Sequence, residues 1–134
     1  MNRKEAAAAM HHNKYNCCQA VVCAFEDVLD VDKETLFRIA EGFGAGMGGM
    51  QGTCGALSGA VMLAGLKNSD KNLENPGSKG ATTKLSKEMA NRFEEKSGAT
   101  ICRELKGVDT GVVLCSCPDC ISNAVEIAEE VLGL

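Results

Sequence analysis

Apolar residues recur three and four positions apart along most of the chain, and polar residues occupy the positions between them. This spacing is typical of helices that pack one face against a core. Only residues 108–114 contain a run that suits a β-strand, and a single strand has no partner with which to form a sheet. The pattern therefore predicts an all-α fold, a bundle of five to seven helices. The predicted helices cover residues 2–12, 16–29, 32–43, 53–66, 81–96 and 100–107, and a last one begins at Pro118.

The segment from Gly42 to Gly65 interrupts this pattern, because it contains nine of the fifteen glycines. Each glycine inside a helix costs about 1 kcal/mol relative to alanine. We therefore expect residues 42–52 to form an irregular, Gly-rich loop and residues 53–66 to form a helix, with Thr53 as its N-cap and Cys54 as its first residue. The loop matches the dinucleotide-binding pattern GxGxxG, but a helix rather than a strand precedes it, which argues against a nucleotide site.

The overall composition limits the classes of function. With 134 residues the chain is expected to form one domain, residues 1–134, whose core needs no covalent cross-links. A net charge of −4 argues against nucleic acid as a partner, since phosphate binding requires a basic surface. No apolar run reaches the length of about 18 residues that a membrane span requires, so we expect no membrane partner.

Eight cysteines are the unusual feature of the composition. A chain of this length does not need disulfides, and the apolar run Ala6–Ala9 is too short for a signal peptide. We therefore expect a reducing, cytoplasmic setting, in which grouped cysteines more often bind metal or carry out redox chemistry. Cys18 and Cys23 fall within an apolar helix and are expected to pack as small hydrophobic residues. His11 and His12 are adjacent on a helix, point in different directions, and are expected to face solvent.

Four cysteines lie in the first turn of a predicted helix. Cys17 and Cys54 directly follow capping residues, and Cys102 and Cys120 each lie two residues after a helix-start signal. Unpaired N–H groups at a helix start favour a thiolate over a thiol by about 0.3–1 kcal/mol. If the four helix starts converge, they form an anionic cysteine centre. Backbone support for this centre is expected from three glycines of the same segment, Gly52, Gly55 and Gly59.

Two other uses of the cysteines also fit their spacing. Cys117 and Cys120 form a CxxC motif at a helix start, which resembles the dithiol of thioredoxin-like proteins and predicts a cycling disulfide. A thioredoxin-like site, however, follows a strand of a mixed sheet. Alternatively, Cys102, Cys115, Cys117 and Cys120 offer four thiolates to a structural zinc ion. Outside these two alternatives, Cys115 and Cys117 are accessory thiols.

The sequence around the cysteines resembles that of a known family. Its segments are, in order, Asn16-Cys17 with Gln19-Ala20-Val21, the Gly-rich loop, Thr53-Cys54-Gly55-Ala56-x-x-Gly59, Cys102-Arg103-Glu104-Leu105 and Cys120. They are similar in order and spacing to the C-GCAxxG-C-C family of redox-active proteins, over nearly the whole chain. The resemblance implies a small helical protein with an iron–sulfur or other redox centre. It also implies that the functional cysteines are Cys17, Cys54, Cys102 and Cys120.

The cysteine set and the resemblance together lead us to expect electron transfer through an iron–sulfur cluster, most simply 2Fe–2S, with those four cysteines as metal ligands. N–H donors from the helix starts would stabilise the reduced form and raise its potential. A metal-free thiol–disulfide protein is the alternative from a different class, and a zinc module is the third. Because no His, Ser or carboxylate constellation accompanies the cysteines, we expect no catalytic residues and no independent enzymatic activity. The expected partner is an unidentified redox protein, and a homodimer is compatible with so small an electron carrier.

Overall fold

The computed structural model describes all 134 residues and contains seven α-helices and no β-strand. The all-α single domain expected from the sequence is thereby confirmed. No helix is long and apolar enough to cross a membrane. The helices are α1 (Arg3–His12), α2 (Cys17–Cys23), α3 (Lys33–Ala40), α4 (Gly55–Asn68), α5 (Lys79–Ser97), α6 (Cys102–Leu105) and α7 (Cys117–Leu132).

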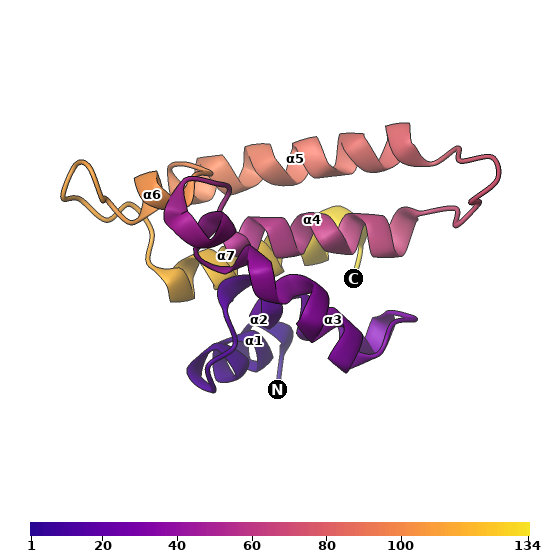
Figure 1. The fold of residues 1–134 in the computed structure, drawn as a ribbon, viewed down its shortest axis with the longest axis horizontal. Helices are drawn as coiled ribbons and strands as arrows, with labels where there is room; N and C mark the ends of the chain where they lie inside the picture. The colour runs from indigo at the N-terminus through magenta and orange to yellow at the C-terminus, as the bar shows by residue number, and fades with distance from the viewer.

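Helix α4 lies at the centre of the bundle and packs against α2, α5 and α7 (Figure 1). Its small residues allow close approach of the neighbouring backbones. A Cβ added at Gly59 would lie 3.0 Å from Cβ of Val21 and 3.1 Å from the carbonyl oxygen of Cys18, both in α2. Larger buried side chains such as Phe25 and Phe93 complete the core. The close packing of α2 on α4 brings the first residues of these two helices near each other.

Short polar side chains fix where α2 and α7 begin. Asn16 caps α2 through a capping box: its side chain accepts a hydrogen bond from the amide of Gln19 at 2.9 Å, and the Gln19 side chain accepts one from the amide of Asn16 at 2.9 Å. Ser116 caps α7 by accepting a hydrogen bond from the amide of Asp119. The first residue of each of these helices is a cysteine, so the caps position both thiols.

Helices α4 and α6 begin side by side because the residues before them pair with each other. Thr53 and Ile101 form an antiparallel bridge, and the amide of Cys54 donates to the carbonyl oxygen of Thr100 at 2.8 Å. This pairing keeps the backbone extended for one more residue, so Cys54 and Ile101 become the N-caps of α4 and α6. The prediction that Thr53 caps α4 is therefore wrong by one residue. The helix predicted to start at residue 100 is α6, and it starts two residues later, at Cys102.

The Gly-rich segment forms the irregular loop expected from the sequence, with a single π-helical turn at Gly46–Met50. Ala45, Met47 and Met50 have positive φ angles of 54°, 65° and 65°. This left-handed conformation costs a residue with a side chain about 1–2 kcal/mol. Gly46 also has a positive φ, 56°, and a Cβ there would lie only 2.4 Å from Cβ of Cys102. The strained loop therefore packs closely against the start of α6.

Candidate functional site

Cysteines occupy the starts of four helices. Cys17, Cys102 and Cys117 are the first residues of α2, α6 and α7, and Cys54 is the N-cap of α4. Cys120 lies three residues after Cys117 and therefore shares its face of α7. The starts of α4, α6 and α7 lie at the same end of the molecule (Figure 1). The start of α2 joins them, since a Cβ on Gly55 would lie 3.5 Å from Cβ of Cys17.

The thiols at these helix starts form two contacting pairs. Cys17 and Cys117 are neighbours, close enough that each thiol shifts the pKa of the other, so the start of α2 lies beside the start of α7. Cys54 and Cys120 are neighbours in the same sense, so the start of α4 also lies beside α7. Cys102 lies beside the pairs, close enough to feel the charges of Cys54 and Cys117. The structure thus brings together the four cysteines named from the sequence and adds Cys117; all eight cysteines of the chain are free thiols.

A lysine side chain reaches into this cysteine cluster. Lys106, the C-cap of α6, is half-buried, and its Nζ donates to the carbonyl oxygen of Cys115 at 2.9 Å and to Sγ of Cys120 at 3.6 Å. Its charge also acts on Cys117 and lowers the pKa of that thiol. Burial lowers the pKa of Lys106, but the neighbouring Cys120, Cys117 and Cys54 raise it, and the net shift is upward. The lysine therefore stays positively charged among the thiols.

Each thiol pair contains one acidified cysteine. The neighbouring Cys120 thiol, the amides of Ala56 and Leu57, and the charge of Lys106 lower the pKa of Cys54 to about 6. The pKa of Cys120 is raised by the neighbouring Cys54 and by burial, and its thiol donates to the carbonyl oxygen of Cys115 at 3.7 Å. At neutral pH this pair consists of one thiolate, on Cys54, and one thiol.

The second pair is arranged in the same way. The neighbouring Cys17 thiol, together with the charges of Lys106 and His11, lowers the pKa of Cys117 to about 5. The pKa of Cys17 is raised by the neighbouring Cys117 and by burial. The pKa of Cys102 is also raised, chiefly by burial. The centre therefore carries two thiolates close to one ammonium group.

The predicted glycines contribute to the site through close backbone packing. A Cβ added at Gly55 would lie only 2.9 Å from the carbonyl oxygen of Phe43, so the backbones pack closely there. Gly52 accepts a hydrogen bond from the amide of Cys102 at 3.0 Å, and its own amide donates to the carbonyl oxygen of Gly46 at 3.1 Å. Gly59 serves the packing of α2 on α4 described above. The amides that lower the pKa of Cys54 belong instead to Ala56 and Leu57, in the first turn of α4.

Besides Cys102, three other cysteines lie outside the two pairs. Cys18 is buried in the core, where its thiol contacts Sδ of Met62 at 3.8 Å and burial raises its pKa to about 12. Cys23 is also buried in the core, and burial raises its pKa. Sγ of Cys115 accepts a hydrogen bond from Asn123 at 3.8 Å, while its carbonyl oxygen holds Lys106.

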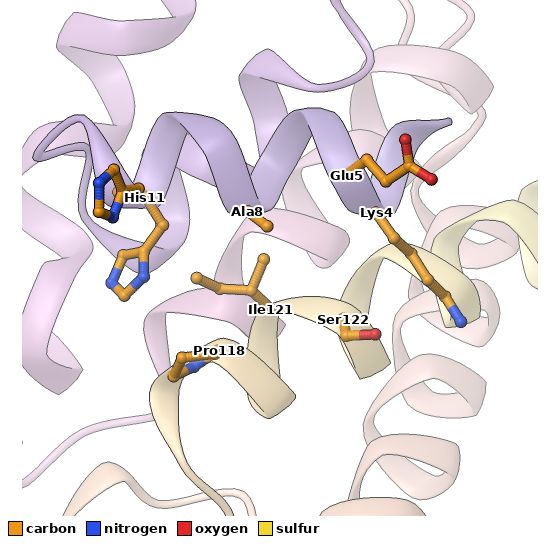
Figure 2. A pocket seen from close by; sticks show the side chains of 8 residues that line it. Lys4, Glu5, Ala8, His11, Pro118, Ile121 and Ser122 are labelled. Atoms are coloured by element: carbon orange, nitrogen blue, oxygen red, sulfur yellow. The ribbon is translucent and has the colours of Figure 1, made fainter. Parts of the chain in front are cut away.

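A surface pocket beside α1 borders the start of α7, although no cysteine lines it. This pocket of about 400 Å³ lies between α1 and the start of α7 (Figure 2). His11 of α1 and Pro118 of α7 stand on facing walls of this pocket, with Ile121 between them. Cys117, which directly precedes Pro118, and Cys17 are partly exposed, whereas Cys54, Cys102 and Cys120 are buried. An external reagent or partner would therefore meet the Cys17–Cys117 pair first.

A family model described as "Putative redox-active protein (C_GCAxxG_C_C)" matches residues 15–131 of the chain. The chain belongs to this family. The match extends from just before Cys17 to near the end of α7, so it includes every cysteine of the two pairs. The resemblance stated from the sequence is confirmed. Neither the search of curated proteins nor that of solved structures finds a match.

The family's description as redox-active raises the question of which group the site can hold. No group of three or more His, Cys, Asp or Glu side chains is placed to hold one metal ion. The donor set nevertheless suits a two-iron cluster in kind and number, because it offers soft sulfur ligands in two pairs. In the C-GCAxxG-C-C chain the residues that would hold such a cluster are Cys17 with Cys117 and Cys54 with Cys120, and Cys102 is the fifth thiol nearby.

From the sequence, Cys117 was expected to be an accessory thiol, and Lys106 was not expected to belong to the site. Cys117 was detectable from the CxxC spacing, because residues three apart share one face of a helix and both thiols of α7 can then point toward α2 and α4. Lys106 carried no signal of its own. It is an ordinary lysine in a charged stretch, and only the return of the chain at Cys115 brings it back to α7.

Proposed function

We propose that this protein is an electron carrier that binds a 2Fe–2S cluster at the cysteine cluster. The observation that carries the proposal is the division of the thiols into two contacting pairs, Cys17 with Cys117 and Cys54 with Cys120. Two thiolates on one tetrahedral metal lie about 3.8 Å apart for metal–sulfur bonds of about 2.3 Å. A 2Fe–2S cluster takes two thiolates on each iron, so two separate contacting pairs are the arrangement that it requires.

The residues around the two pairs would favour the thiolate form of the cysteines, which is the form that binds a 2Fe–2S cluster. Ligands bind as thiolates, and in each pair one cysteine, Cys54 or Cys117, already has a lowered pKa. The amides of Ala56 and Leu57, at the start of α4, favour negative charge on Cys54. When bound, the cluster supplies one-electron chemistry. The partly exposed Cys17–Cys117 pair would lie on the side from which a redox partner protein approaches. Free thiols of this kind need a reducing environment, in keeping with the cytoplasmic setting expected from the sequence.

The ligand set derived from the sequence, with Cys102 in place of Cys117, is the competing assignment. Serine variants decide between the two sets. The protein is purified without oxygen and analysed for iron, acid-labile sulfide and its visible spectrum. We expect about two iron and two sulfide per chain in the natural sequence. Cys117→Ser should lose most of the iron and Cys102→Ser should keep it, and the reverse result would favour the sequence-derived set.

A matched control is available within the same chain. Cys23→Ser makes the same chemical change at a thiol of the core, away from the two pairs, and should leave the iron content unchanged. Iron lost equally in the control and in Cys117→Ser would indicate a general loss of stability. A natural-sequence protein that is free of iron and sulfide after oxygen-free purification would overturn the proposal, and tightly held zinc would indicate the structural zinc module.

A metal-free thiol–disulfide carrier is the second candidate, and a specific observation favours it. Each pair joins a thiolate to a thiol, which is the starting state for disulfide formation. Oxidation of the Cys54–Cys120 pair would form one S–S bond and pass two electrons to a disulfide on a partner protein. The proton of the Cys120 thiol would go to one of the two partner sulfurs, so that the partner disulfide is reduced to one thiol and one thiolate. Iron-free protein whose pairs titrate reversibly in a glutathione buffer would establish this function.

A further inference from the structure

Lys106 is the one charged side chain that touches the cysteine cluster directly. Its Nζ lies 3.6 Å from Sγ of Cys120. Cys120 and Cys117 both belong to α7. The other partner of Nζ is a neutral backbone group, the carbonyl oxygen of Cys115 at 2.9 Å. No carboxylate pairs with Lys106, whereas the nearby Arg103 is held by Asp109 at 2.8 Å and 2.9 Å. The positive charge of Lys106 is therefore available to the sulfur atoms alone.

The backbone fixes this lysine in position. The amide of Lys106 donates to the carbonyl oxygen of Cys102 at 3.0 Å, which ties it to the end of α6. The chain then turns at Gly107 and comes back, and the amides of Leu114 and Cys115 both donate to the carbonyl oxygen of Leu105, at 2.9 Å and 3.3 Å. This return places the Cys115 carbonyl oxygen against the ammonium group. Lys106 is thus positioned by the same loop that leads into α7.

We propose that Lys106 is the counter-charge of the redox site and makes the site easier to reduce. The inference rests on the proposed function, in which the centre gains an electron on a group held by thiolates. A fixed positive charge in a partly buried site stabilises the more negative, reduced form relative to the oxidised form. The ammonium group of Lys106 is held 3.6 Å from Sγ of Cys120 and has no carboxylate partner, so its charge acts on the sulfur atoms at the start of α7.

Lys106→Met tests the proposal, because methionine keeps an unbranched side chain and removes the charge. The midpoint potential of the oxygen-free, iron-loaded protein is measured for the natural sequence and the variant. We expect the variant to keep its iron and sulfide, and its equilibrium constant for reduction to fall roughly tenfold, which corresponds to about 59 mV for one electron. Lys106→Arg keeps the positive charge and should restore most of the potential.

Lys84→Met is the matched control, since Lys84 is an exposed lysine of α5 that forms no ion pair. It makes the same change in net charge away from the site and should leave the potential unchanged. The proposal would be overturned if iron-loaded Lys106→Met had the same midpoint potential as the natural sequence. It would also be overturned if Lys84→Met lowered the midpoint potential as much as Lys106→Met does, because the effect would then reflect net charge alone.

A second measurement keeps the inference testable without a cluster. If Lys106→Met takes up no iron, the metal-free natural and variant proteins are equilibrated in glutathione buffers and their disulfide content is measured. Loss of the lysine removes stabilisation of the reduced thiolates, so the variant should form disulfides at a more reducing ratio by roughly tenfold. Unchanged disulfide equilibria would overturn the role of Lys106. Absence of iron from the natural sequence, by contrast, would reject the iron–sulfur function and leave the role of Lys106 to this measurement.

Discussion

Gly46 is the position at which the Gly-rich loop comes closest to the cysteine cluster, so an added methyl group tests the local geometry. A Cβ at Gly46 would lie 2.4 Å from Cβ of Cys102 and 2.9 Å from the carbonyl oxygen of Gly52. The left-handed backbone at this residue costs alanine about 1–2 kcal/mol, and overpacking adds about 1–3 kcal/mol. We therefore expect Gly46→Ala to lower the free energy of unfolding by about 2–5 kcal/mol.

Gly48→Ala provides the matched control for this prediction. Gly48 also has a positive φ, 87°, but no atom lies within 4 Å of its Cβ position. The control therefore carries the conformational cost without the contact at Cys102. Urea unfolding of the metal-free proteins, followed by circular dichroism, gives both free energies. Gly46→Ala should lose about 1–3 kcal/mol more than Gly48→Ala, and equal losses in the two variants would refute the contact.

Three further changes test other parts of the account. When the reduced, metal-free proteins are alkylated, the fastest kinetic phase of the natural sequence should be missing from the Cys117→Ser variant. In the natural sequence that phase should slow only as the pH falls through about 5, because the thiolate is the reactive form and the pKa of Cys117 is lowered to about 5. Slowing near the ordinary thiol pKa of about 8.5 would contradict this. Gly65→Ala, which adds a methyl group in open space on α4, should raise the free energy of unfolding in urea by about 0.5–1 kcal/mol; a decrease would count against the packing of α4. Asn16→Ala removes the capping box of α2 and a hydrogen bond to the carbonyl oxygen of Glu41, and should lower the same free energy by about 1–2 kcal/mol; no change would show that the cap contributes nothing.

The helices were predictable because local sequence decides them. Apolar spacing gave the fold class, and left-handed glycines end α5 at Gly98 and α7 at Gly133 as their sequence positions suggest. The exception is the predicted helix over residues 16–29. It ends at Cys23 and gives way to a 3₁₀ turn at Glu26–Val28, although no glycine or proline marks the change.

Features that depend on contacts between distant segments were not predictable. The starts of α4 and α6 shift because Thr53 pairs with Ile101, and those two residues are far apart in the chain. The placement of cysteines at helix starts followed from capping signals, whereas the convergence of those starts was a hypothesis. Which thiol contacts which depends on how α2 and α4 cross α7, so the partnership of Cys17 with Cys117 required the structure.

The contacting pairs are the central claim, and disulfide mapping tests them directly. The reduced, metal-free protein is treated with a limiting amount of a thiol oxidant and digested without reduction, and its cross-linked peptides are identified by mass spectrometry. The account predicts that the first disulfides join Cys17 to Cys117 and Cys54 to Cys120, segments that are distant in sequence. Early disulfides that instead join neighbours in the chain, such as Cys115 to Cys117, with Cys17 and Cys54 left as free thiols, would contradict it.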